Sequence, residues 1–164
     1  MVILKNILVA TDFSEPSSVA LAYGRELATS YRATLHVLHM VENVMVHYSP
    51  EIGLTSPVLQ EKIEAVAQRD LEKLISADDR RTLDVKLLVQ RSPTVAGGIE
   101  DYARAQSIDL VVVGTHGRSG IQRVLMGSVA ERVVRTAPCP VLAVRTPERD
   151  FVSSDARAAA QRVG

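Results

Sequence analysis

The chain alternates between strand-like and helix-like segments along most of its length, and this order constrains the fold more than any other feature. Several strand-like segments are continuous apolar runs, which is typical of strands buried on both faces. Such alternation predicts an α/β fold in which helices cover both faces of an open parallel sheet, joined by right-handed crossovers. The expected strands are residues 3–10, 33–41, 82–90, 108–114 and 140–145, and the expected helices are 14–31, 58–76, 92–106 and 128–137.

Capping residues indicate where two of these helices begin. Ser14 precedes a helical pattern that has Pro16 in its first turn, a combination typical of helix N-termini. Ser92, followed directly by Pro93, predicts a similar start for the third helix. Residues 42–57 contain two prolines and a glycine, so they predict a long loop before the second helix.

The composition fits one globular domain, which we expect to span residues 1–147. The chain has 164 residues, 46% of them hydrophobic, and a domain of this size can bury most of its apolar surface. Residues 148–164 form a polar, alanine-rich tail, expected either as a frayed helix or as a disordered segment. The formal net charge of zero lacks the basic footprint of a nucleic-acid-binding protein, so no nucleic acid partner is expected.

Cysteine content and hydropathy indicate the cellular compartment. Cys139 is the single cysteine, so the chain forms no intramolecular disulfide, a pattern typical of a reducing environment. No apolar run approaches the roughly 18–20 residues that span a bilayer. The apolar N-terminus has neither a charged flank nor a small-residue cleavage site, so it is interpreted as a strand and not as a signal peptide. These features predict a cytoplasmic protein without a membrane partner.

A glycine-rich loop joins the fourth strand to the last helix. Gly114 ends the strand, Gly117 and Gly120 follow, and Gly127 directly precedes Ser128 at the start of the helical pattern. In open parallel sheets, ligands bind outside the carboxyl ends of the strands where the strand order reverses. Asp12 lies just beyond the carboxyl end of the first strand, which is a natural neighbour of the fourth.

Two interpretations of this loop remain open from spacing alone. Gly127, Ser128 and Val129 could hold phosphate oxygens, because a helix N-terminus offers unpaired N–H groups and a positive dipole end. Alternatively, the glycines form a structural turn, and Ser128 with Glu131 forms a capping box. The loop matches neither the Walker A motif nor the G-x-G-x-x-G fingerprint.

The sequence resembles the universal stress protein family. Nucleotide-binding members carry G-x2-G-x9-G-[S/T], and this chain keeps that spacing with Gly114, Gly117, Gly127 and Ser128. Its "NILVATDFSE" resembles the first strand of the family, and "APCPVLAVR" resembles the closing strand. The resemblance runs from about residue 5 to residue 145.

The resemblance implies a Rossmann-like sheet of five parallel strands in the order 3-2-1-4-5 and a site for ATP, or for ADP or AMP. By position, Asp12 should meet the ribose, backbone near Ala10 and Met40 should contact adenine, and Val113 and Gly114 should lie against the nucleoside. The residues expected around the phosphates are Gly117, Gly127, Ser128 and Val129.

Other candidate residues are weighed by their positions. Arg118 and His116 could both neutralise phosphate charge, and Arg118 could make bidentate contacts. The alternative is that both lie on a solvated loop. His36 and His39 should lie on opposite faces of their strand, which favours packing over metal ligation. His47 and Tyr48 could cover the nucleotide. Asp109 opens the fourth strand and is expected to be structural.

We favour an ATP-binding stress-response regulatory module with slow or no turnover. Phosphoryl transfer needs metal ligands and a group that positions the nucleophile, and Asp12 is the one acidic residue that sequence places near the site. Mg²⁺ is then expected to be held through the phosphates and water. The alternatives are a slow ATP hydrolase or phosphotransferase and a dimeric interaction protein whose nucleotide is structural.

The last strand predicts a homodimer. Its apolar residues Val141, Leu142 and Val144 should lie at the sheet edge, where unpaired backbone groups favour pairing with a second copy. The resemblance points the same way, because many universal stress proteins dimerise through this strand. The alternative is a C-terminal tail that folds over the edge and keeps the chain monomeric.

Overall fold

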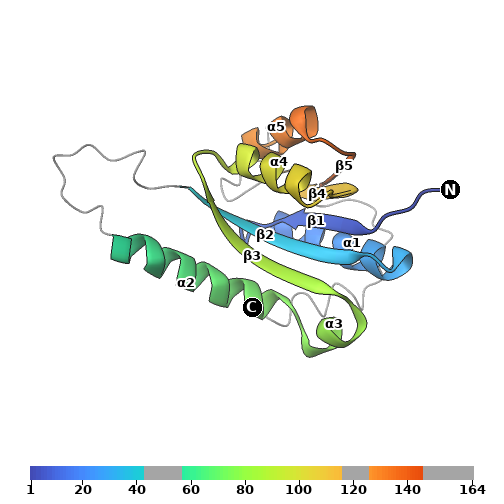
Figure 1. Cartoon of the computed structure of the whole chain (residues 1–164), viewed down its shortest axis with the longest axis horizontal. Coiled ribbons are helices and arrows are strands. Elements are labelled where there is room, and N and C mark those ends of the chain that lie inside the picture. The colour runs from blue at the N-terminus through green and yellow to red at the C-terminus, as the bar shows by residue number, and fades with distance from the viewer. Residues whose placement is uncertain (43–56, 116–125, 146–164) are drawn as a thin grey trace.

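The computed structural model describes residues 1–42, 57–115 and 126–145. Within these residues, five parallel strands form one twisted sheet in the order β3-β2-β1-β4-β5, which confirms the predicted order (Figure 1). The strands are β1 Asn6–Ala10, β2 Thr34–Glu42, β3 Val85–Ser92, β4 Leu110–Gly114 and β5 Val141–Val144.

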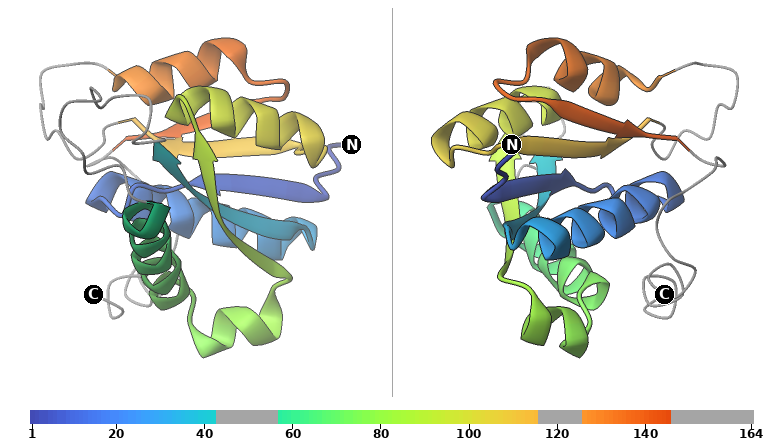
Figure 2. Two further views of the ribbon diagram at one scale, coloured as in Figure 1. Left: turned by 60° about the vertical axis from the view of Figure 1, so that its left-hand side comes forward. Right: turned by 90° about the vertical axis from the view of Figure 1, so that its right-hand side faces the viewer.

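Helices cover both faces of the sheet, as the alternation predicted (Figure 2). Side chains of β1 alternate between the faces: Ile7 and Val9 pack in the core under α1 and α2, whereas Leu8 packs in the core under α4 and α5. The helices are α1 Glu15–Tyr31, α2 Pro57–Leu74, α3 Ala77–Thr82, α4 Val95–Ala105 and α5 Ser128–Thr136.

The caps confirm one predicted helix start and correct another. Ser14 is the N-cap of α1, and its side chain accepts a hydrogen bond from the Ser17 amide. The N-cap of α4 is Thr94, so the prediction of Ser92 was wrong. Pro93 disfavours helical geometry at the residue before it. Ser92 therefore remains extended and ends β3, paired with Glu42 of β2.

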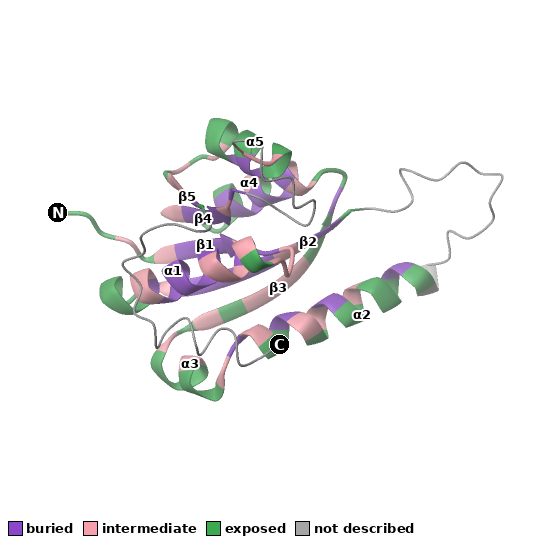
Figure 3. Cartoon of the chain, turned by 180° about the vertical axis from the view of Figure 1, so that it is seen from behind, coloured by how far each residue is buried: buried purple, intermediate pink, exposed green. Residues whose placement is uncertain are grey.

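The helix expected over residues 58–76 is α2, and the short helix α3 that follows it was not predicted. α2 ends at Leu74, and Ser76 caps the short α3 in a reciprocal capping box with Asp79. One face of α2 is buried and another is exposed (Figure 3). Leu71 is fully buried, whereas Leu59, Ile63 and Val66 are exposed.

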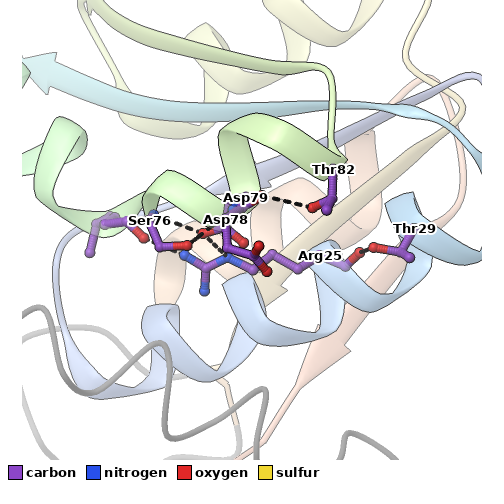
Figure 4. A network of polar contacts seen from close by, with 7 residues as sticks. Arg25, Thr29, Ser76, Asp78, Asp79 and Thr82 are labelled. Carbon is purple, nitrogen blue, oxygen red and sulfur yellow. Dashed lines mark hydrogen bonds and ion pairs between the residues drawn. The ribbon is translucent and has the colours of Figure 1, made fainter.

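Arg25 of α1 holds the junction between α2 and α3 from below (Figure 4). Its guanidinium donates to the Leu74 carbonyl at the end of α2 and lies 3.3 Å from the Asp79 carboxylate of α3. Burial lowers the pKa of Arg25, and the Asp79 charge opposes that shift. The interruption between the two helices at residues 75–76 therefore has an ionic contact with α1.

A search of the described helices finds none that is both long enough and apolar enough to cross a bilayer.

Candidate functional site

A cavity of about 230 Å³ opens at the carboxyl ends of β1 and β4, where the strand order reverses. Strands β1, β2 and β4 form its floor, and the first turns of α1, α4 and α5 form its walls. Ligands of open parallel sheets bind at this position. The lining residues are Ala10, Thr11, Asp12, Ser17, Leu38, His39, Met40, Val95, Ile99, Val113, Gly114, Thr115, Gly127, Ser128, Val129 and Ala130.

The cavity brings together most of the residues that sequence assigned to a nucleotide site. These residues come from three strands, the turn after β1 and the start of α5: Ala10, Asp12, Met40, Val113, Gly114, Gly127, Ser128 and Val129. Gly117 and Arg118 lie outside the described residues, as do His116, His47 and Tyr48. The assignment of these residues to particular parts of a ligand remains a prediction.

Gly114 is required by packing at the start of α1. A Cβ at this position would lie 2.8 Å from both the carbonyl carbon and the oxygen of Pro16, and backbone atoms cannot move aside as a side chain can. Sequence interpretation had explained the glycine by close approach of a ligand. The structure adds a different cause, because α1 crosses β4 so closely that no side chain fits between them.

Gly127 is the N-cap of α5, with φ −69° and ψ 152°, so it does not adopt a left-handed conformation. Ser128 is therefore the first helical residue and cannot form the expected capping box with Glu131. The side chain of Glu131 instead lies 3.8 Å from Arg135, one turn along the helix. In the first turn, the N–H groups of Ser128, Val129 and Ala130 have no acceptor within the helix.

Thr115 holds this helix start in place beside the sheet. Its carbonyl accepts a hydrogen bond from the Gly127 amide at 2.6 Å, and its own amide donates to the Val144 carbonyl at 2.9 Å. The residue is 2% exposed. One residue thus connects the wall of the cavity to the edge strand β5.

Hydroxyl groups and a carboxylate form the opposite wall, at the start of α1. The hydroxyls of Thr11 and Ser17 lie 3.0 Å apart, and the Thr11 hydroxyl also accepts from the Phe13 amide at 3.1 Å. The Ser17 hydroxyl donates to the Ser14 carbonyl at 2.8 Å. Because a hydroxyl carries one proton, Ser17 must accept from Thr11, so both hydroxyl protons are used within the protein. This wall therefore offers lone pairs to a ligand, supplemented by the Asp12 carboxylate.

His39 supports the same wall from β2. Its Nδ1 lies 2.8 Å from the Thr11 carbonyl, and since a carbonyl only accepts, Nδ1 carries a proton there. The ring centroid lies 4.4 Å from that of Phe13. His36 packs on the other face of the sheet, with Nδ1 2.7 Å from the Tyr102 hydroxyl, so the predicted opposite faces are confirmed. Burial lowers the pKa of His36.

Apolar side chains form much of the cavity lining, among them Leu38, Met40, Val95, Ile99 and Val113. A Cβ at Gly98 of α4 would overlap the end of the Met40 side chain, so this glycine gives the methionine its space beside β2. An apolar lining with a few polar groups is the usual character of a small-molecule site.

Sequence reasoning missed three polar residues of the cavity, namely Thr11, Ser17 and Thr115. Thr11 and Thr115 each directly follow the carboxyl end of a predicted strand, so the sequence already placed them at the ligand-binding edge of the sheet. Ser17 occupies the first turn of α1, three residues after the predicted cap Ser14. A search for hydroxyl groups at strand ends and first helical turns would have found all three.

Asp109 has the structural role expected of it, and Cys139 also lies outside the cavity lining. The Asp109 carboxylate accepts hydrogen bonds from the amides of Lys5 and Asn6 at 2.7 and 2.9 Å, which joins the starts of β4 and β1. Cys139 packs against the core beneath α4 and α5. Burial, followed by the charge of Asp109, raises the pKa of its thiol, which disfavours a reactive thiolate.

Comparisons with known proteins identify relatives along almost the whole domain. The model of the universal stress protein family matches residues 4–145. Universal stress protein A homolog 1 of Coxiella burnetii is 36% identical over 145 residues, which cover 85% of this chain and 95% of the relative.

Solved structures with the same fold extend this likeness. The universal stress protein UspA from Lactobacillus plantarum aligns with a TM-score of 0.71 and 28% identity, covering 88% of this chain and all of that one. A universal stress protein solved in complex with cAMP aligns with a TM-score of 0.59 and 23% identity, covering 88% and 99%. At that identity the second likeness concerns the fold alone.

Proposed function

The chain belongs to the universal stress protein family, and from this premise we propose that it is an ATP-binding regulatory module that turns its nucleotide over slowly or not at all. The proposal places the nucleotide in the cavity at the carboxyl ends of β1 and β4. We also propose that the protein is cytoplasmic and has no nucleic acid partner.

The observation that carries the proposal is the opposite hydrogen-bonding character of the two cavity walls. At the start of α5, Ser128, Val129 and Ala130 present amide donors and the positive end of a helix dipole. At the start of α1, Thr11, Ser17 and Asp12 present acceptors. A ligand that carries an anion at one end and hydroxyl donors at the other satisfies both walls, and a ribose phosphate has this arrangement.

The apolar floor between the walls suits a planar base. Ala10 and Met40 are proposed to contact adenine, and Val113 with Gly114 to lie against the nucleoside. The Asp12 carboxylate is proposed to accept from the ribose hydroxyls. Gly127, Ser128 and Val129 are proposed to hold the phosphates, assisted by Gly117 and Arg118. The cAMP complex of a protein with this fold supports an adenine nucleotide.

Slow turnover follows from the groups that line the cavity. Asp12 is the acidic side chain among the lining residues, and the proposal assigns it to the ribose. Across residues 1–42, 57–115 and 126–145, no group of three or more His, Cys, Asp and Glu side chains is placed to hold a metal ion. We therefore propose that Mg²⁺, where present, is bound through phosphate oxygens and water.

A homodimer through β5 is proposed as the assembly. β5 is the last strand of the sheet, and Val141, Leu142 and Ala143 are half-buried on it, while Val144 is buried. Pairing with the same strand of a second copy would cover a backbone edge that otherwise invites aggregation. A dimeric interaction protein with a structural nucleotide remains the second candidate, because Thr115 connects the cavity to this same strand.

Nucleotide analysis of freshly purified protein tests the proposal. The protein is denatured and the released small molecules are identified by mass, and the stripped protein is then titrated with ATP, ADP, AMP and GTP by calorimetry. We expect an adenine nucleotide among the released molecules and saturable binding of ATP in preference to GTP. A refolded chain that binds no nucleotide at millimolar concentration would contradict the proposal.

A further inference from the structure

The turn between β1 and α1 folds the Asp12 side chain back onto Ser14. The Ser14 amide donates to Asp12 Oδ1 at 3.1 Å, and the Ser14 hydroxyl donates to the same oxygen. Two donors from one residue on one carboxylate oxygen restrict the orientation of the whole carboxylate. That carboxylate lines the cavity, so its orientation decides how it meets a ligand.

Backbone strain accompanies this arrangement. Phe13, which lies between Asp12 and Ser14, has φ 65°, a left-handed conformation that bulky residues rarely adopt. Its amide donates to the Thr11 hydroxyl at 3.1 Å, and its ring packs against His39 with centroids 4.4 Å apart. Strained residues persist where the surroundings fix them, and they cluster at ligand sites. The turn is therefore built to hold Asp12 and Ser14 together.

We propose that Ser14 is a positioning residue, which aims the Asp12 carboxylate at the sugar hydroxyls and so sets a preference for ribonucleotides over their deoxy analogues. This inference rests on the proposed nucleotide site. It adds a specificity determinant that does not touch the ligand. Acceptors on the α1 wall recognise a sugar only through its hydroxyl donors, so a correctly aimed carboxylate discriminates where a misplaced one does not.

The same serine also caps α1, because its Oγ accepts from the Ser17 amide at 3.4 Å. Substitutions at Ser14 can separate its role as the cap of α1 from its role in orienting the Asp12 carboxylate. Asp is as good an N-cap as Ser, but its carboxylate repels Asp12 and donates no hydrogen bond to it. Thr keeps both the cap and the hydroxyl donor. Ser14→Asp therefore removes positioning and keeps the cap, whereas Ser14→Thr preserves both.

The experiment compares ATP with 2′,3′-dideoxy-ATP by calorimetry on the full chain. The variants are Ser14→Asp, Ser14→Ala and Ser14→Thr, with Ser76→Ala as a matched loss of a serine cap at α3. A hydrogen bond to a charged group predicts that the native chain binds ATP about 10-fold or more tightly than the dideoxy analogue. Ser14→Asp and Ser14→Ala should reduce this preference to below about 3-fold, and Ser14→Thr and Ser76→Ala should retain it.

Each contrary outcome points to a different error. A Ser14→Asp or Ser14→Ala chain that binds ATP with the native preference overturns the positioning role, as does a native chain that binds both nucleotides equally; the nucleotide site itself survives either result. A native chain that binds neither overturns the proposed function, and the inference fails with it. Thermal unfolding of every variant shows whether a lower nucleotide affinity comes from a less stable fold. If loss of the helix cap were the cause, Ser14→Ala would lose the preference for ATP and Ser14→Asp, which keeps the cap, would retain it.

Discussion

The carbonyl of Thr115 accepts a hydrogen bond from the Gly127 amide at 2.6 Å, across a loop that separates the two residues by twelve positions. This bond places the N-terminus of α5 directly beside the carboxyl end of β4. The helix start thereby becomes a wall of the cavity, opposite the start of α1. The proposed phosphate-binding wall depends on this position of α5 beside β4.

Replacement of Gly114 by alanine should destabilise the fold. The new Cβ would lie 2.8 Å from the Pro16 backbone, and relief requires α1 to move away from β4. Overpacking of this kind costs about 1–3 kcal/mol. Urea unfolding measures the loss. Gly97→Ala is the matched control: its Cβ meets only the rotatable Thr94 hydroxyl, so its effect should stay within about 1 kcal/mol. Equal stability of Gly114→Ala and the native chain would contradict the close approach of α1.

The free energy of unfolding should decrease as the pH drops below the pKa of a typical histidine. Burial, followed by the charge of Lys86, lowers the folded-state pKa of His36, while Asp84 opposes the shift. The unfolded chain then binds the proton more readily, so the free energy of unfolding decreases as the pH falls through about 6.5, by at most about 1.4 kcal/mol per pH unit. Urea unfolding at pH 7.5 and pH 5.5 measures the difference.

His36→Gln provides the control for this pH dependence, because it removes the titrating ring and keeps a group that can bond to Tyr102. The variant should lose part of the decrease in stability that the native chain shows between the two pH values. An identical decrease in both proteins would assign the effect to other groups.

Leu142→Lys should dissociate the proposed dimer. A lysine on the half-buried edge strand would place a charge in the apolar contact between two copies. Light scattering at micromolar concentration should give a dimer for the native chain and a monomer for the variant. Val134→Lys, at a position of α5 that is 44% exposed, adds the same charge outside the strand and should leave the mass unchanged. A native monomer would exclude the dimer, and a dimeric Leu142→Lys chain would place the interface elsewhere.

The sequence predicted the sheet and its order because long-range topology follows from the alternation of elements and from a family resemblance. Strand ends were also predictable: β1 ends at Ala10 and β4 at Gly114, as expected. Since the carboxyl ends of parallel strands meet at one edge, residues at those ends were expected together, and the cavity contains them.

Local boundaries were less predictable, because they depend on competing contacts. Ser92 and Thr94 are both good capping residues, and only the extended geometry imposed by Pro93 decides between them. The break between α2 and α3 depends on a capping box at Ser76 whose Asp79 also meets Arg25. Leu59, Ile63 and Val66 recur at helical spacing and yet are exposed, because the buried face of α2 carries Gln60, Ala67 and Leu71 instead.

The cavity contains most of the residues predicted for the site, but the structure gives two of them a cause that the sequence did not indicate. Gly114 matched a ligand-binding motif, yet its lack of a side chain is explained by Pro16. Ser128 matched a capping box, yet Gly127 is the cap. In both cases the residue type is compatible with two explanations. The position of α1 decides between them for Gly114, and the exact start of α5 decides for Ser128.

Calorimetry of Gly127→Val with ATP and with adenosine tests most directly whether the start of α5 holds phosphate. The backbone of Gly127 is extended, so valine can adopt it without backbone strain, and its side chain would stand at the first turn of the helix. Thr136→Val, at the other end of α5, is the control. The account predicts that Gly127→Val lowers ATP affinity by about 10-fold or more while adenosine affinity changes by less than about 2-fold. A folded Gly127→Val chain that binds ATP as the native chain does would contradict it.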